Sequence, residues 1–206
     1  FLSTKLPGVG DILTLKLNAA SYEGQSGTIA FIAGHDDYAV ANVTVKTVDT
    51  ENCKITIDED AANLVSQQAI IKFTLKKKAY DVTINPTQLT VTDGTNTATV
   101  TTVSSTYEDN GAGVLYVAFP ATGLTETITL NATVGEDTYI YEKSGVTFEK
   151  GKYYTVSVKM NRSINLANIK TNFEAQNGDM LTGTLGSNGK ISIADGATVT
   201  LDNATI

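Results

Sequence analysis

The sequence predicts an all-β protein, built as two tandem Greek-key β-sandwich domains and a short C-terminal segment of solenoid-like strand repeats. Apolar and polar residues alternate over short stretches along most of the chain, which is typical of strands with one buried face. Turn-forming Gly, Asn and Asp residues separate these stretches. Hydrophobic residues make up 41% of the 206 residues and charged residues 18%, as expected for a folded chain with a core.

Residues 1–84 are predicted to form the first sandwich domain. Alternating apolar residues indicate its strands, at residues 13–17, 43–45, 53–57, 71–75 and 80–84. Residues 28–33 are almost wholly apolar, which predicts a strand covered on both faces. Asp58 is expected to cap a short helix over residues 59–68, because carboxylates in a first turn are favoured by the helix dipole. Short strands divided by polar turns at this spacing indicate a sandwich or barrel.

The second sandwich is predicted over residues 85–160. Its boundary is placed at Asn85-Pro86, because proline lacks an amide hydrogen and restricts the residue before it. Asp93-Gly94 lies between two alternating runs and predicts a hairpin. Residues 107–113 are expected to form a polar loop. Further strands are predicted at residues 115–119, 128–134, 146–148 and 154–160.

The run at residues 154–160 is the most regular of these patterns. Tyr154, Val156, Val158 and Met160 are predicted to face the core, since side chains point to opposite faces of a strand in turn. The polar turn before this run contains Gly151, which can adopt a positive φ. We therefore expect a short strand, a glycine corner and a long half-buried strand that ends the domain.

Residues 161–206 are predicted to be a connector and a short β-repeat segment. The connector, residues 161–175, has little β signal. From Gly178 on, Gly-Asn and Asp-Gly turns separate tiny strands, at residues 181–185, 191–193 and 199–201. Such strands suit the first rungs of a β-solenoid, in which each rung buries its apolar face against a neighbour. The alternative is that they cap the second sandwich.

The two ends of the sequence are abrupt. Phe1 is not preceded by an initiator Met, and the last residues stop within a repeating strand pattern. We therefore expect the chain to be part of a longer protein.

The charge of the chain disfavours nucleic acid as a partner. The net charge is −7 and the pI is about 4.7, whereas binding to phosphates needs clustered Lys and Arg. Arg162 is the only arginine, and the one dense lysine run is at residues 76–78. No apolar run reaches the roughly 18 residues that a membrane-spanning helix requires.

No residue is predicted to be catalytic, to bind a cofactor or to bind a metal. Cys53 is the only cysteine, which rules out an internal disulfide, and its alternation with Ile55 and Ile57 predicts a buried, inert thiol. His35, the only histidine, lies in Gly34-His35-Asp36-Asp37. This cluster could in principle hold a metal or act as a base, but it is interpreted as a turn.

Other candidate sites are interpreted in the same way. Asp58-Glu59-Asp60 lacks the spaced ligands and the glycine of a calcium loop, and the chain contains neither Gly-x-Ser-x-Gly nor a phosphate loop. Most of the nine tyrosines fall on predicted strands, although Tyr38 and Tyr107 fall on predicted loops. The sequence therefore predicts a protein that is not an enzyme.

Two segments carry a resemblance to a known family. GVTFEKGKYYTVSVKM at residues 145–160, together with LYVAFP at residues 115–120, resembles the last strands of the fimbrillin (Mfa-like) proteins of Bacteroides-type bacteria. The resemblance extends over roughly residues 10–160. It implies two β domains in tandem and a surface lipoprotein of the outer membrane or fimbrium, with a precursor that is lipid-anchored to the outer membrane.

The resemblance also implies a mode of assembly. In pili of this family, proteolysis removes an N-terminal strand, and a segment of the neighbouring subunit fills the groove. Residues 1–17 would lie beside that groove. The arginine processing signal of the family is not visible, since no Arg precedes Arg162, and the repeats at the C-terminus depart from the usual pilin tail.

Three functions are compatible with these observations. The first is a non-catalytic cell-surface or fimbrial subunit, or adhesin-like protein, which acts through strand addition or surface display and has neighbouring pilus subunits as partners. The second is a glycan-binding accessory module, for which Tyr107 is the candidate contact with a host or glycan ligand. The third is the N-terminal part of a β-solenoid polysaccharide-active protein, suggested by residues 178–206.

Overall fold

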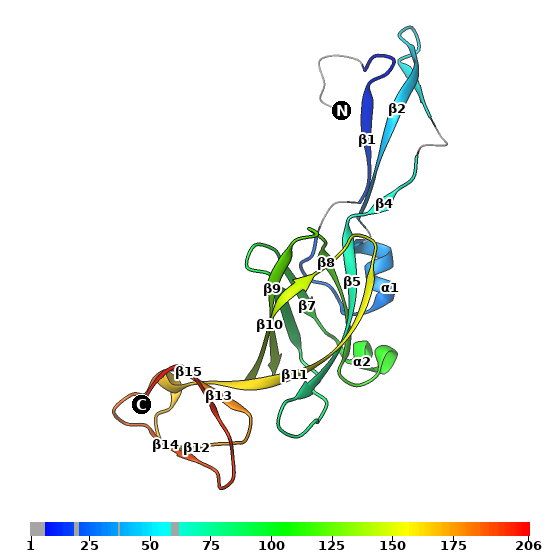
Figure 1. The fold of residues 1–206 in the computed structure, drawn as a ribbon. Helices are drawn as coiled ribbons and strands as arrows, with labels where there is room; N and C mark the ends of the chain where they lie inside the picture. The colour runs from blue at the N-terminus through cyan, green and yellow to red at the C-terminus, as the bar shows by residue number, and fades with distance from the viewer. Residues whose placement is uncertain (1–6, 19–20, 37, 59–61) are drawn as a thin grey trace.

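The structure is a computed structural model that describes the chain except residues 1–6, 19–20, 37 and 59–61. Strands account for 55% of it and helices for 9%, which confirms the all-β class. The molecule is elongated, as Figure 1 shows: an N-terminal sheet projects from one end of a central body, and the last strands lie at the other end.

The N-terminal sheet is antiparallel. It contains β1 (Ile12–Leu17), β2 (Ala39–Asp49), β3 (Lys54–Ile57) and β4 (Val65–Ser66). The central strand is β2, which pairs with β1 along one edge and with β3 and β4 along the other. Alternate residues of β2 are buried, as its period-two pattern requires. The strands predicted at residues 13–17 and 43–45 are confirmed, and the one predicted at residues 53–57 is confirmed from Lys54 on.

The strand predicted at residues 28–33 is wrong. This segment forms α1 (Ile29–Phe31), followed by a π-helix, η1 (Ile32–Asp36). The Thr28 hydroxyl accepts a hydrogen bond from the Phe31 amide and so caps the helix. Only Ile32 is buried, whereas Ile29 is exposed, so the apolar run has a single inward face.

The helix predicted over residues 59–68 is wrong for the part that the structure describes. Residues 62–64 have no regular structure, and Val65 and Ser66 pair with Val40 and Ala39 of β2. Pairing with a distant strand outweighs the local helix signal. Residues 59–61 of this prediction lie outside the described residues.

The central body contains seven strands around one hydrophobic cluster, to which every strand contributes. They are β5 (Gln68–Lys77), β6 (Gln88–Thr92), β7 (Thr97–Thr101), β8 (Val114–Pro120), β9 (Thr125–Val134), β10 (Asp137–Thr147) and β11 (Tyr153–Asn165). β8, β5 and the first half of β11 are paired in that order, and β7, β6, β9 and β10 form the other path. The hairpin predicted at Asp93-Gly94 connects β6 and β7 and is confirmed.

The domain boundary predicted between residues 84 and 85 divides this hydrophobic cluster, which contains residues from both sides of it. Ala69, Phe73 and Ile84 on one side of it share the core with Leu89 and Val158 on the other. Residues 68–84, which the sequence assigned to the first domain, therefore pack with residues 85–160. The reason is the pairing of β5 with β8 and β11, whose sequence distance leaves no local signal.

Two local predictions in the central body are also wrong. Residues 80–84 do not form a strand: a turn ends at Tyr80, and the rest is irregular except for one isolated bridge between Lys76 and Thr83, with Val82 exposed. The expected loop at residues 107–113 begins within a helix, α2 (Ser104–Asn110). Thr106 is fully buried and its hydroxyl donates to the Ser26 carbonyl, which attaches α2 to the body.

The last part of the chain, residues 161–206, is called the C-terminal stack here. It continues from β11 through a short 3-10 helix, η3 (Leu166–Asn168), into β12 (Asn172–Ala175), β13 (Asp179–Thr184), β14 (Lys190–Ile193) and β15 (Thr200–Thr205). β13 pairs in parallel with both β11 and β15, and β12 pairs in parallel with β14. The expected connector thus contains the end of β11 and all of β12, while the three predicted small strands are confirmed.

The C-terminal stack has a small core of its own. Leu166, Ile169, Ala175 and Leu181 are buried together, apart from the cluster of the central body. Partly buried side chains of Phe173, Ile191 and Val199 pack against this core, and the parallel pairs β12–β14 and β13–β15 hold the segments that carry them together. This arrangement explains why strands of only four to six residues persist here.

The close contact at Gly113 gives a test of the core. We expect Gly113→Ala to lower the free energy of unfolding by about 2–5 kcal/mol, because φ is +70° and an added Cβ would contact Thr83 and lie 2.9 Å from the Leu75 carbonyl oxygen. Gly135→Ala is the matched control. It has φ +61° with no atom near its Cβ position, so it should cost only about 1–2 kcal/mol. Equal losses in denaturant unfolding would contradict this packing.

Candidate functional site

The open edge of the N-terminal sheet is the first candidate site. Within the described residues β1 has a single neighbour, β2, with Leu13, Leu15 and Leu17 opposite Val43, Ala41 and Ala39. Among the described residues, the backbone amides and carbonyls on the outer edge of β1 therefore have no strand partner, which is the arrangement that accepts an additional strand.

The apolar face of this sheet is only partly covered. Ala39, Ala41 and Val43 of β2 are at most 5% exposed, yet Leu15 of β1 is 37% exposed and Leu17 is 41% exposed. Directly opposed residues of an antiparallel pair lie on the same face. Burial therefore falls off toward the β1 edge, and a further strand beside β1 would cover the exposed leucines.

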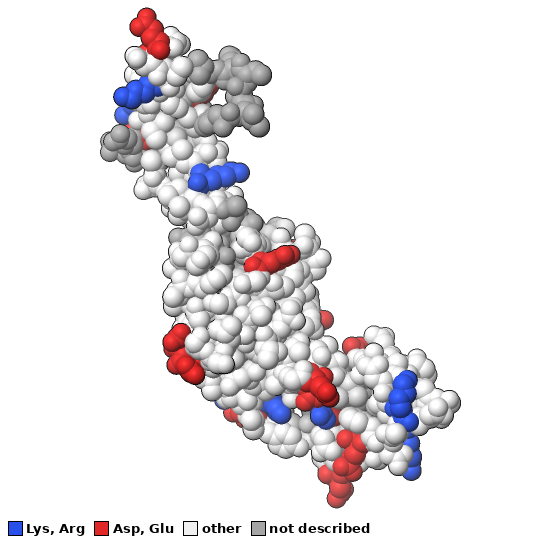
Figure 2. Space-filling model, turned by 180° about the vertical axis from the view of Figure 1, so that it is seen from behind, with Lys and Arg blue, Asp and Glu red and all other residues white. Residues whose placement is uncertain are grey.

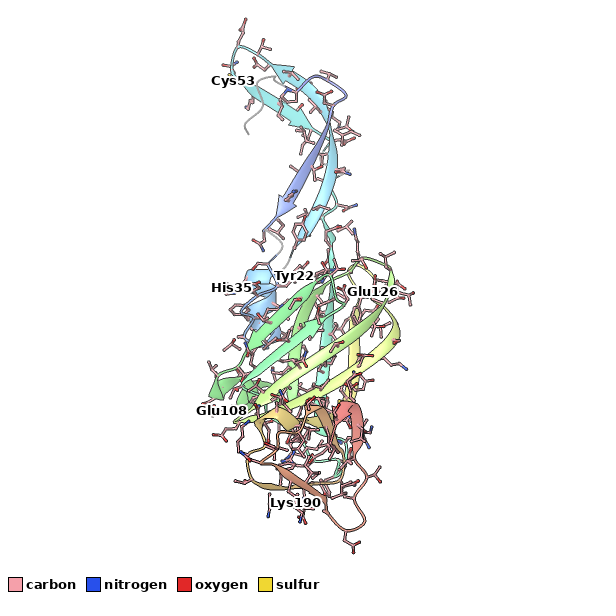
Figure 3. All side chains as sticks on the ribbon, turned by 90° about the vertical axis from the view of Figure 1, so that its left-hand side faces the viewer. Tyr22, His35, Cys53, Glu108, Glu126 and Lys190 are labelled. Carbon is pink, nitrogen blue, oxygen red and sulfur yellow. The ribbon has the colours of Figure 1, made fainter. Side chains whose placement is uncertain are left out.

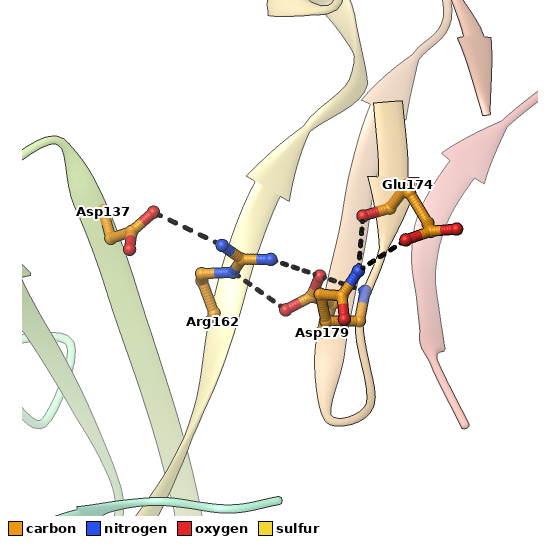
Figure 4. A network of polar contacts seen from close by, with 5 residues as sticks. Asp137, Arg162, Glu174 and Asp179 are labelled. Carbon is orange, nitrogen blue, oxygen red and sulfur yellow. Dashed lines mark hydrogen bonds and ion pairs between the residues drawn. The ribbon is translucent and has the colours of Figure 1, made fainter. Parts of the chain in front are cut away.

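The second candidate site lies where the central body meets the C-terminal stack. Figure 2 shows that charged side chains of both signs gather there, while much of the face of the central body that it displays is uncharged. At the centre of the junction, Arg162 of β11 forms two hydrogen bonds with Asp179 of β13, at 2.9 Å from Nε and 2.7 Å from Nη2 (Figure 4). Two parallel bonds of this kind are the strong geometry for an arginine–carboxylate pair.

Asp179 is 2% exposed, and its other contacts fix the turn before it. Its carboxylate also accepts a hydrogen bond from the Gln176 amide at 2.8 Å, and Asp137 of β10 lies 3.8 Å from Nη1 of Arg162. The hydrogen bonds that Arg162 donates to Asp179 raise the pKa of Arg162, against the opposing effect of burial. Arg162 thus connects β10, β11 and β13.

A hollow of about 170 Å³ adjoins this ion pair. Its floor includes the buried side chains of Met160 and Tyr139. Lys77, the last residue of β5, holds its ammonium 5.6 Å from the centre of the Tyr139 ring, a cation–π distance. On the rim, Gly178 touches the turn after β5, since a Cβ there would lie 3.0 Å from that of Ala79.

The reactive residues that the sequence analysis considered, His35 and Cys53, belong to neither of these two candidate sites. Figure 3 shows His35 and Cys53 on separate parts of the chain. His35 lies in the π-helix instead of the expected turn, exposed, with its ring stacked on Phe31 at 4.4 Å. Asp37 of the same cluster lies outside the described residues.

The buried thiol predicted at Cys53 is wrong. Cys53 is exposed, with φ +51°, in the turn between β2 and β3. The alternation with Ile55 and Ile57 ends at the first residue of β3, Lys54, because the hairpin turn occupies the preceding residues. Asp58 forms an ion pair with Lys46 at 3.0 Å and caps no described helix, and Glu59 and Asp60 lie outside the described residues.

The two tyrosines expected on loops differ. Tyr38 lies outside regular structure, as predicted, and is half-buried. Tyr107 lies in α2, and its hydroxyl donates to the Pro86 carbonyl at 2.6 Å. Burial raises the pKa of Tyr107 to about 12, while a hydrogen bond with Thr102 acts in the opposite direction. Tyr107 therefore serves packing in the central body.

Sequence reasoning missed the junction altogether. It placed Arg162 in a connector without strands and gave Asp179 no role. The only available signal was a lone arginine after a regular strand and, 17 residues later, an aspartate after an Asn-Gly turn.

Among the described side chains, no group of three or more His, Cys, Asp and Glu residues is placed to hold a metal ion. The described helices all lack the length and apolar character needed to cross a bilayer. No protein family, curated protein sequence or solved structure matches this chain.

Removal of the buried carboxylate tests the junction. We expect Asp179→Ala to lower the free energy of unfolding by about 2–4 kcal/mol, because it leaves a partly buried guanidinium without its partner. Asp202→Ala, which removes an exposed carboxylate of β15, should change it by no more than about 0.5 kcal/mol. Indistinguishable denaturation curves for the two variants would show that the ion pair contributes nothing.

The environment of Tyr107 gives a pH prediction. Folding favours the neutral phenol, so its contribution to stability is complete below the unfolded pKa of about 10 and is lost as pH rises through about 12. We expect Tyr107→Phe to remove a step of tyrosinate absorbance near pH 12 in a pH titration, and to flatten the loss of stability across this range. Identical titrations of both proteins would contradict the assignment.

Proposed function

We propose that this chain is a non-catalytic cell-surface or fimbrial subunit, or adhesin-like protein, which acts through strand addition at β1 or through surface display. The observation that carries the proposal is the open β1 edge with its exposed leucines, at one end of an elongated molecule. The partner is an extended segment of a neighbouring subunit with apolar residues at alternate positions.

Several features support strand addition over chemistry at this edge. Main-chain hydrogen bonds to β1 would supply affinity, and side chains packed on Leu15 and Leu17 would supply register. On the opposite face of β1, Ile12 is 69% exposed and lies beside the polar Thr14 and Lys16, so the apolar side of the edge is the one that carries the leucines. Long apolar edges are rare on proteins that have no partner for them, because they promote edge-to-edge association.

The finer architecture also belongs to this proposal. The parallel pairing of β11, β13 and β15 supports a short solenoid-like C-terminal segment, and the seven strands around one core support a sandwich with Greek-key connections. The location at the outer surface, the fimbrial assembly and the lipid anchor of a precursor follow from the resemblance at residues 145–160.

The edge can be tested with the protein alone. We expect the purified chain, at high concentration, to form SDS-resistant ladders that Leu15→Lys abolishes, because a lysine would place an unpaired charge on the apolar face that the added strand would cover. Leu124→Lys replaces an exposed leucine outside the strands and should leave the ladders unchanged.

A strictly monomeric wild-type chain would exclude self-assembly through β1. Surface display is tested separately, by proteolysis of intact Bacteroides-type cells that express the full gene. Cleavage of the protein is expected on intact cells, and protection until lysis would contradict an outer-surface location.

A further inference from the structure

The lining of the hollow beside Arg162 holds more basic than acidic side chains, while Asp137, outside the lining, lies 3.8 Å from Arg162. Lys77, Lys78 and Arg162 line the hollow, and Asp179, already bonded to Arg162, is its only lining carboxylate. The lining therefore has an excess of two positive charges in a chain whose net charge is −7. Among the described residues, no carboxylate lies within 4.0 Å of either lysine.

Lys77 is held in place, which distinguishes it from a solvated surface lysine. Lys77 lies two residues after Leu75, so its side chain lies on the same, inward face of β5. Its backbone pairs with Met160 of β11, and its ammonium lies over the Tyr139 ring. Nearby, Lys76 and Lys159 both bind Asp81, at 3.0 and 3.1 Å. The one acidic group of this turn is thus occupied by other lysines, and Lys77 remains available.

The rim supplies groups of a different kind. Tyr80, which is 60% exposed, lines the hollow together with Gln176 and Asn177. The Gln176 side chain donates to the carbonyl and carboxylate of Glu174, and the side-chain oxygen of Asn177 accepts a hydrogen bond from the Thr198 amide. An exposed aromatic ring offers an apolar face to a sugar ring, while amides exchange hydrogen bonds with hydroxyl groups. Gly178 and Ala79, which lie close together, both line the hollow, so the turn after β5 and the turn before β13 meet there.

From this arrangement we propose that the hollow binds one anionic sugar unit, with its carboxylate or sulfate between Lys77 and Lys78 and its ring against Tyr80. The volume of about 170 Å³ is below the roughly 300 Å³ of sites that enclose drug-sized ligands, so a single unit enters and the rest of a glycan stays in solvent. This site lies far from β1 (Figure 1) and does not depend on strand addition.

The proposal is tested by titration of the purified chain with D-glucuronate, D-glucose 6-sulfate, D-glucose and inorganic sulfate, followed through the backbone amide signals of Asn177 and Gly178. Low ionic strength is required, because salt screens exposed charges. We expect both acidic sugars to show binding at ligand concentrations of up to roughly 10 mM, and D-glucose to show none in this range. Inorganic sulfate is expected to bind more weakly than either acidic sugar.

Matched variants assign the binding to the hollow. Lys77→Met and Lys78→Met should each weaken binding of the acidic sugars by about tenfold, the loss of one charge-assisted hydrogen bond. Lys143→Met, which removes an exposed lysine outside the hollow, should not. Tyr80→Ala should weaken binding of the acidic sugars and leave inorganic sulfate unaffected. Thermal unfolding of each variant shows whether it is folded. Because Lys78 is exposed, Lys78→Met should remain folded and can still test the site if Lys77→Met is unstable.

Three results would overturn the proposal. Absence of shifts with both acidic sugars would show that the hollow binds no anionic sugar. Unchanged affinity in both lysine variants would place binding elsewhere, and equal binding of inorganic sulfate and D-glucuronate would show that the sugar ring makes no contact. None of these results bears on SDS-resistant assembly through β1, so the two proposals fail independently.

Discussion

The backbone pairing of β11 holds the molecule together. Its first half, Tyr153–Met160, pairs in parallel with β5, and its second half pairs with β10 on one side and β13 on the other. The central body and the C-terminal stack thus share one continuous strand. The bonds from Arg162 to Asp179 lie where β11 passes from one to the other, and they fix the register of β13 on β11.

Much of the fold could be predicted because the relevant interactions are local. In β5, the alternation of Ile71, Phe73 and Leu75 with polar residues identified a strand and its buried face, since burial follows the period of the backbone. Asp93-Gly94 identified a hairpin because its turn needs a glycine, whose φ is +89° here, and the Asp93 side chain accepts hydrogen bonds from the Thr95 and Asn96 amides.

The remaining features depend on contacts between distant residues. Nothing near Ile70 indicates that it pairs with Tyr153, so the sequence divided a core that the structure joins. For the same reason, the sequence did not predict the two candidate sites. The open edge of β1 can be recognised only when the strands that pair with β2 are known, and Lys77 and Arg162 line one hollow only because β11 pairs with β5. Cys53 was misjudged because a hairpin turn interrupts its apparent alternation.

Amide hydrogen exchange along β11 tests this account most directly. If the strand is shared, the strand-paired amides of its two halves, residues 153–160 and 161–165, should exchange slowly and with similar protection, because both halves then belong to one cooperatively opening unit. Exchange of residues 161–165 together with a rapidly opening C-terminal stack, while residues 153–160 stay protected, would show that the two parts are independent and would contradict the account.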